Sequence, residues 1–305
     1  MISKLFFFVL FAVSLTVSAS PQSAKMITDG AGRLLLQHYD PISGEYQETS
    51  KDHGLPVRIL GDYFTAVGFS QIPGHSRVSA LGNNPDIDVA APEDVWTGGG
   101  TYPWMPAATS LEIVSGCADD SASGIGARTV LVNTLSGTYA ELPQILTMNG
   151  TSAVPLPSQG LRINPSFILT AGTNRTNVCD ITIRDAGGGA TRAVIPAGYG
   201  ITRQSAYTIP AGKTLSIVSF VFSITRAGGA TKSATIATFI QTSANVYRLP
   251  LELEIATGSP YLHPGQPGVV LPEKTDFAFR VTAVTAENTN VTAAWLGVLK
   301  TNGVD

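Results

Sequence analysis

The chain has 305 residues, which is enough for two or three domains with cores of their own. Only 13% of its residues are charged, against ~25% in an average soluble protein. The net charge of -3 and the single, scattered positions of the 19 Lys and Arg residues argue against nucleic acid as a partner. A low-charge surface is common where protein meets protein, because few ions must be desolvated on contact.

The first 19 residues have the pattern of a secretory signal peptide. Lys4 precedes an apolar run at residues 5–13, and small residues follow at Val17, Ser18 and Ala19. One positive charge, a short apolar segment and small residues at a cleavage position are typical of export. The run is short for a membrane span. The alternative is an N-terminal arm that contacts other subunits.

Residues 20–106 are predicted to form an extended, irregular docking region. Isolated strands are expected at 34–36 and 55–60, and residues 68–106 show almost no periodicity. A long segment without elements of its own is usually functional or linking. Trp96, Tyr102 and Trp104 indicate that it is ordered, because large aromatic side chains offset the entropy of fixing glycine-rich backbone. We predict that these three residues form an inter-domain or inter-subunit contact.

Residues 107–189 are predicted to form a β domain. Branched and aromatic residues pack well on a pleated surface and poorly against a helical turn. Asn149-Gly150 predicts a tight hairpin turn, because both residues tolerate positive φ. The glycine run at 187–189 is the expected domain boundary. Strands are expected at 110–115, 128–132, 145–148, 162–169 and 180–184.

Residues 190–305 are predicted to form a C-terminal β-sandwich that resembles a jelly roll. Strands are expected at 215–225 and 234–240, and the strand at 276–284 is expected to pair with that at 291–299. The fold class is therefore all-β, with β-sandwich or jelly-roll-like domains and a long irregular N-terminal segment.

Cys117 and Cys179 are the two cysteines. One disulfide and two buried free thiols are both compatible with the sequence, because spacing alone does not place their Cα atoms within bridging distance.

The sequence supplies no catalytic, cofactor or metal site that we would name. Residues 211–214 end like a phosphate-binding loop, but Tyr207 stands where that motif needs its leading glycine. The four histidines are isolated, and no nucleophile elbow is present. Acidic residues crowd two loops, and hard oxygen ligands of this kind are what calcium uses, so calcium is kept as a minor hypothesis. These acids are Asp86, Asp88, Glu93, Asp94, Asp119 and Asp120.

Several segments resemble virion structural proteins of tailed bacteriophages, especially marine ones. They are GHSRVSALGNNPDID (74–88), PEDVW (92–96), GGGTYP (98–103), GARTVLV (126–132), MNGT (148–151), YTIPAGKT (207–214), EKTD (273–276) and RVTA (280–283). The resemblance covers roughly residues 74–300. It implies a virion component and transfers no catalytic residue.

We therefore expect a non-enzymatic virion structural protein, either a head decoration or a fibre or appendage component. Its expected partners are other virion proteins, further copies of itself (a trimer) and the host surface. The alternative is a secreted bacterial module that binds glycans or surfaces, which the leader favours. A third reading, a carbohydrate-active enzyme on a β-sandwich, needs two acids converging in a cleft.

Overall fold

The computed structural model describes residues 37–40, 45–48, 63–225, 232–242, 246–263 and 269–304. The chain divides into two units, Met1–Leu60 and Gly61–Asp305. In the first unit, β1 (Gln37–Asp40) and β2 (Glu45–Glu48) form an antiparallel pair. The predicted leader at 1–19 and the predicted strands at 34–36 and 55–60 lie outside the described residues.

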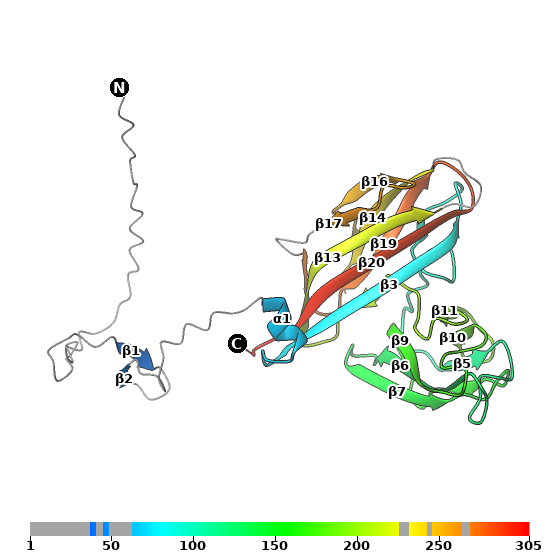
Figure 1. Cartoon of the computed structure of the whole chain (residues 1–305), viewed down its shortest axis with the longest axis horizontal. Coiled ribbons are helices and arrows are strands. Elements are labelled where there is room, and N and C mark those ends of the chain that lie inside the picture. Colours follow the sequence, from blue (N-terminus) through cyan, green and yellow to red (C-terminus); the bar gives the residue numbers. More distant parts are fainter. Residues whose placement is uncertain are drawn as a thin grey trace, which may run out of the picture. The chain divides into compact units, whose positions relative to one another are not determined.

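The second unit is almost entirely β structure, and its described part has one short helix, α1 (Tyr63–Gly68) (Figure 1). No helix among the described residues is long and apolar enough to cross a membrane. The predicted all-β class is confirmed.

The unit consists of a jelly-roll lobe and an inserted lobe, which we define as residues 105–202, between β4 and β12. The jelly-roll strands are β3 (His75–Ile87), β4 (Glu93–Asp94), β12 (Tyr207–Thr208), β13 (Lys213–Thr225), β14 (Ser233–Gln241), β15 (Tyr247–Arg248), β16 (Glu252–Ala256), β17 (Tyr261–His263), β18 (Val269–Leu271), β19 (Asp276–Val284) and β20 (Thr289–Thr301).

The strand pairing is that of a jelly roll. The first strand, β3, pairs with the last, β20, and β4 and β12 pair with the last but one, β19. Between these strands in the sequence, β13 pairs with β17 and β18, and β14 pairs with β15 and β16. This nested pairing of strands that are increasingly close in sequence produces two facing antiparallel sheets. We call them the β20 sheet (β17, β18, β13, β20, β3) and the β19 sheet (β4, β12, β19, β14, β15, β16).

The space between the two sheets is filled by aromatic and branched side chains. On β13, alternate residues face inward and are buried, with one shift in register between Ile217 and Ser219. Phe222 and Phe279 come from opposite sheets and meet edge to face with ring centroids 4.7 Å apart. Such aromatic pairs contribute beyond the area they bury. The largest members of this core are Phe220, Phe222, Phe277, Phe279 and Trp295.

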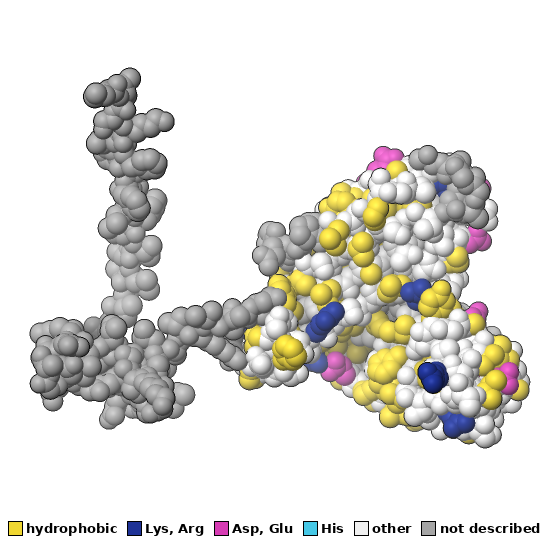
Figure 2. All heavy atoms as spheres, viewed as in Figure 1, with side chains coloured by type: hydrophobic (Ala, Val, Ile, Leu, Met, Phe, Trp, Pro, Cys, Tyr) yellow, Lys and Arg dark blue, Asp and Glu magenta, His cyan; other side chains and the backbone are white. Residues whose placement is uncertain are grey.

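The inserted lobe is a second, smaller sandwich. One sheet contains β5 (Leu111–Ser115), β8 (Val154–Pro155), β10 (Ile181–Asp185) and β11 (Thr191–Ile195). The other contains β6 (Ala127–Leu135), β7 (Glu141–Thr147) and β9 (Arg162–Ala171). The core between them includes Ile113 and Ile183 from the first sheet and Val130 and Val132 from the second. Hydrophobic side chains also gather on the outer side of this lobe (Figure 2).

Three predicted features of the strand arrangement are wrong. The strands at 276–284 and 291–299 do not pair, because β19 and β20 belong to opposite sheets and the short link between them crosses the sandwich. Asn149-Gly150 does not close a hairpin: only Gly150 has positive φ, and β8 pairs with β5 instead of β7. The predicted irregular segment at 68–106 contains a 13-residue strand, β3.

The glycine run at 187–189 is a hairpin turn inside the inserted lobe instead of a domain boundary. It joins β10 to β11, which pair with each other. The carboxylate of Glu112 accepts hydrogen bonds from the backbone N–H groups of Gly187 and Gly188, each at 3.0 Å. The hydrogen bond from Gly187, followed by that from Arg184, lowers the pKa of Glu112. The chain leaves the inserted lobe only after β11, near residue 202.

Candidate functional site

The three aromatic residues predicted from sequence lie together. The rings of Trp96 and Tyr102 are 5.2 Å apart at 73°, and those of Tyr102 and Trp104 are 4.6 Å apart at 60°. Trp96 and Tyr102 are buried and Trp104 is partly buried. They pack on Phe239 and Ala278 of the β19 sheet, in a cluster separate from the sandwich core. We call this group the aromatic junction. Its part in assembly stays a prediction.

Local backbone geometry explains the glycines beside Trp96. A Cβ atom on Gly98 would lie 2.2 Å from the Trp96 ring, so only glycine allows the chain to fold over the indole. The indole Nε1 then donates to the carbonyl of Gly100 at 3.0 Å. The sequence GGG at 98–100 therefore serves close packing and a tight turn, in which Gly99 and Gly100 have positive φ.

A buried ion pair joins the two lobes next to the aromatic junction. Arg162 of β9 donates from Nε and Nη2 to the two carboxylate oxygens of Asp276 on β19, both at 2.8 Å. The side chains are only 8% and 4% exposed. Arg162 Nη1 also donates to the carbonyls of Met105 and Leu161, and Thr208 donates to Asp276 at 2.6 Å. We call this group the Arg162 clamp.

The electrostatics of the clamp follow from its burial. Desolvation disfavours the guanidinium cation, but the hydrogen bond to Asp276 and its negative charge outweigh this and raise the pKa of Arg162. Arg162 also lies over two rings, 5.5 Å from the centroid of Trp104 and 5.7 Å from that of Tyr139. Burial raises the pKa of the Tyr102 phenol above its usual value. At ordinary pH the Arg162 guanidinium therefore stays positively charged and the Tyr102 phenol stays neutral.

Two side-chain amides add backbone-like links between the lobes. Asn164 donates to the carbonyl of Thr208 at 2.9 Å and accepts from its N–H at 2.8 Å. Gln204 donates to the carbonyl of Ile163 at 2.9 Å. Because both amides are buried, breaking either link would leave polar groups without water. The inserted lobe is therefore fixed on the jelly roll by directional bonds as well as by packing.

The acidic loop at 86–94, a candidate for calcium, is used for internal hydrogen bonds. Asp94 forms a bidentate ion pair with Arg280, at 2.7 and 2.9 Å, and accepts from the N–H of Tyr102 at 2.7 Å. Glu93 accepts from Asn84 at 2.9 Å and from the N–H of Gly100 at 2.7 Å. Across the described residues, no three or more His, Cys, Asp or Glu side chains form a metal-binding group. The calcium hypothesis gains no support from these contacts.

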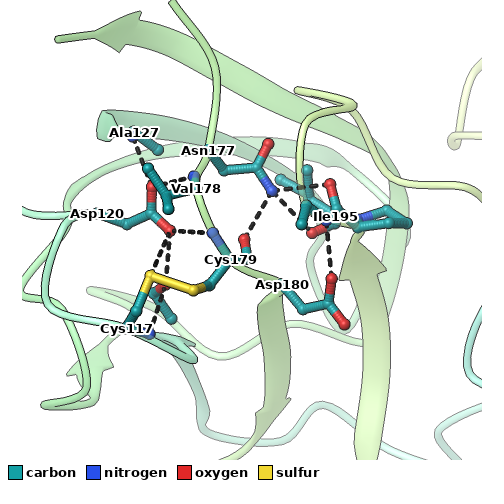
Figure 3. The surroundings of a disulfide bond; sticks show 11 residues. Cys117, Asp120, Ala127, Asn177, Val178, Cys179, Asp180 and Ile195 are labelled. Atoms are coloured by element: carbon teal, nitrogen blue, oxygen red, sulfur yellow. Dashed lines mark hydrogen bonds between the residues drawn. A yellow bond between two sulfur atoms is a disulfide. The ribbon is translucent and has the colours of Figure 1, made fainter. Parts of the chain in front are cut away.

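Asp120, from the second acidic pair, organises the disulfide instead (Figure 3). Cys117 and Cys179 are bonded, which decides between the two alternatives left by the sequence. The fully buried carboxylate of Asp120 accepts from Ser115 at 2.6 Å and from the N–H groups of Ala127, Val178 and Cys179 at 2.8–3.1 Å. It thereby ties the loop after β5 to the start of β6 and to the segment before β10.

A hollow of about 500 Å³ lies between the lobes, alongside the outer edge of β3. Arg77 and Ser79 of β3 form one wall, and Pro143 and Phe167 of the inserted lobe form the other. Glu141 at its rim is paired with Lys213 at 2.7 Å. These residues were not singled out by sequence, because the hollow exists only once the two lobes are fixed together.

Comparison with known proteins gives a fold likeness and nothing closer. No protein-family model and no curated protein matches the chain. It is similar to a structure of infectious bursal disease virus, Gx strain, with 12% identity, a TM-score of 0.23, and coverage of 75% of this chain and 73% of that chain. A mutant VP2 protein of infectious bursal disease virus, from derived T=1 particles, gives 12% identity and a TM-score of 0.23, with coverage of 79% and 76%. At this identity the likeness concerns fold alone, and at this TM-score we base no argument on it.

The two tryptophans of the aromatic junction should respond differently to replacement by phenylalanine. The Trp96→Phe change removes the hydrogen bond to Gly100 and is expected to cost about 1–2 kcal/mol of unfolding free energy. The buried Nε1 of Trp104 has no hydrogen-bond partner among the described residues, so Trp104→Phe should cost less than about 1 kcal/mol. Urea unfolding of both variants measures the difference. An equal loss in the two variants would contradict the hydrogen-bond assignment.

Proposed function

We propose that this chain is a non-enzymatic virion structural protein, a head decoration or a component of a fibre or appendage of a tailed bacteriophage. In this role it works through contacts with other virion proteins and with further copies of itself. The observation that carries the proposal is a jelly roll with a filled interior that holds a second lobe rigidly on its outside. In such a molecule the outer surfaces of the two lobes are available for contacts with other subunits.

The filled interior argues against a ligand site between the two sheets of the jelly roll. Jelly rolls occur in viral capsid proteins, in lectins and in cupins. Here the inner faces of both sheets meet through Phe220, Phe222 and Phe279, and Phe277 packs on Trp295 with ring centroids 5.7 Å apart. A core packed in this way favours a role for the outer surfaces and loops.

The bracing of the inserted lobe supports the same role. The Arg162 clamp and the Asn164 and Gln204 amides fix its orientation on the jelly roll. A projecting lobe that must present one surface to neighbouring subunits benefits from a fixed orientation, because less freedom is lost on binding. Two acids of the acidic loops are engaged within the fold, Asp94 in an ion pair with Arg280 and Asp120 in loop hydrogen bonds.

The sequence resemblance to tailed-phage virion proteins spans both lobes, from about residue 74 to about residue 300. It favours a particle component over a protein that works alone. A trimeric state and contact with the host surface belong to the same proposal.

A secreted bacterial module that binds glycans or surfaces is the second candidate. The Cys117–Cys179 bond favours it, because disulfides form and persist in oxidising surroundings outside the cytosol. The predicted leader at residues 1–19 points the same way.

Sequencing the N-terminus of the native protein separates the two candidates. The virion proposal expects the chain within purified particles, at constant stoichiometry, with an intact Met1. Recovery only as particle-free secreted protein that starts at Ser20 would overturn it. Mass spectrometry of the same fractions provides both the location and the mature mass.

A further inference from the structure

One backbone edge of the jelly roll is open beside the hollow between the lobes. In the β20 sheet, β3 is the outermost strand and pairs with β20 alone among the described strands (Figure 1). Half of the backbone N–H and C=O groups of such a strand point away from its one partner. Within the part of the chain that the structure describes, the backbone of residues 76–81 has no backbone hydrogen-bond partner outside β20. This stretch of edge is therefore free to pair with another chain.

The hollow follows this edge of β3. Arg77, Val78 and Ser79 are consecutive, and all three line the hollow. Successive side chains of a strand point to opposite faces of the sheet, so a cavity lined by three in a row lies at the edge of the strand. The open stretch ends at Gly82, where a Cβ atom would lie 2.1 Å from the carbonyl oxygen of Val95. The free edge and the hollow therefore coincide.

Two polar side chains of the hollow offer donors that the described residues do not use. Arg77 is exposed and has no ion pair or hydrogen bond to any of them. Tyr207 is only 5% exposed, and its hydroxyl likewise bonds none of them. Burial, followed by the negative charge of Glu141, raises the pKa of Tyr207, so its phenol stays a neutral donor. A largely buried donor without a partner is costly unless a bound molecule accepts from it.

The wall opposite β3 is apolar. It is formed by Pro143, Pro165, Phe167 and Ile201 of the inserted lobe. Phe167 is 37% exposed and Ile201 is 40% exposed, so both can be covered further. A concave site between two lobes, with apolar walls and a few placed polar groups, is typical of a binding site. Here the polar groups include a strand edge, which only another backbone matches along its length.

The shape of the hollow favours a single extended segment over a second folded copy. In each copy the inserted lobe lies across the hollow from the β3 edge, in the way of a folded domain. A lone strand is slender enough to enter, because paired strands lie only about 4.8 Å apart. In strand addition, main-chain hydrogen bonds give affinity and contacts of alternate side chains give specificity.

We propose that the open edge of β3 and the hollow form a peptide-binding groove, in which an extended segment of another virion protein adds a strand to the β20 sheet. The segment carries an acidic side chain that pairs with Arg77, and apolar side chains that pack on Phe167 and Ile201. The inference rests on the proposed function and deepens it, because it names the kind of segment through which the chain contacts other virion proteins.

The test measures binding of the fluorescein-labelled peptide VTVDVTV to the full chain by fluorescence anisotropy. Arg77→Glu should weaken binding by about tenfold or more, because it sets two negative charges together. A probe with lysine in place of aspartate should bind this variant better than it binds the natural chain. Arg248→Glu is the matched control, since Arg248 is exposed on β15 of the same lobe, and it should leave binding unchanged. Circular dichroism shows that both variants remain folded.

N-methylation of the probe tests the strand pairing itself. Alternate backbone nitrogens of the probe face β3, and methylating that set should weaken binding far more than methylating the other set, because it removes the donors to the edge. Equal effects of the two sets would overturn the inference. So would a lack of binding at about 1 mM probe.

Other occupants of the groove give distinct results. Binding of maltohexaose that Arg77→Glu abolishes, with no binding of the peptide, would assign the hollow to a glycan and overturn the inference. Self-association of the natural chain that Arg77→Glu abolishes, again without peptide binding, would assign it to a second copy. The N-terminal sequencing of particles reports on the proposed function separately, so a chain found in particles that binds no probe would refute the groove alone.

Discussion

An Arg162→Met variant is expected to lose about 3–5 kcal/mol of unfolding free energy. The change leaves the carboxylate of Asp276, a 4% exposed side chain, without its cation. Among the residues that the structure describes, Thr208 would then be its one remaining side-chain donor, through its hydroxyl. The carbonyls of Met105 and Leu161 lose the same donor. Urea unfolding followed by tryptophan fluorescence and circular dichroism measures the loss.

Two further variants make this result specific to the clamp. Lys213→Met removes a pair with Glu141 whose side chains are 24% and 49% exposed, and should cost less than about 1 kcal/mol. The double variant Arg162→Met with Asp276→Leu should regain much of the loss, because no buried charge is left unpaired. If Arg162→Met cost no more than Lys213→Met, the two lobes would not depend on this ion pair.

Most strands of the second unit could be predicted from local pattern. Residues 215–225 alternate branched or aromatic residues with Ser, and they form β13 with alternate side chains buried. The same holds for β6, β9 and β10, whose positions agree with the predicted runs. Period-two alternation is a local property of the sequence, so it predicts a strand without knowledge of the rest of the fold.

The pairing of these strands could not be predicted, because it is set by distant segments. β19 and β20 are neighbours in sequence, yet each pairs with strands from far along the chain, β14 and β3 respectively. β3 itself contains Gly82, Asn83 and Pro85, a composition typical of loops. It is a strand because β20 provides a partner over almost its whole length and because Asn83 bonds Asn290 and Thr292.

The candidate site was found only in part for the same reason. Trp96, Tyr102 and Trp104 stand out as aromatic residues in a glycine-rich segment. Arg162 and Asp276, separated by 114 positions, show no mutual signal in one sequence. The one available hint was a charged residue at the start of an otherwise uncharged strand. Which apolar residues of β6 and β9 face outward is likewise invisible to sequence, because inward and outward apolar residues differ only in which side of the sheet they face.

Removing the disulfide is expected to have an effect of similar size to breaking the clamp. Cys117 and Cys179 are 62 positions apart, and closing a loop of that length restricts the unfolded chain by about 4 kcal/mol. Replacing both cysteines by alanine should therefore lower the unfolding free energy by about that amount. Urea unfolding with and without reductant measures it, and the double variant should show no response to reductant.

The folded state should be little changed by this substitution, because Asp120 remains in place. Its carboxylate holds the N–H groups of Ala127, Val178 and Cys179, and these bonds do not involve either sulfur. The disulfide variant should thus keep the circular-dichroism spectrum of the natural chain while unfolding at lower urea concentration. A loss of structure without denaturant would mean that the bond holds the loops themselves, and that Asp120 depends on it.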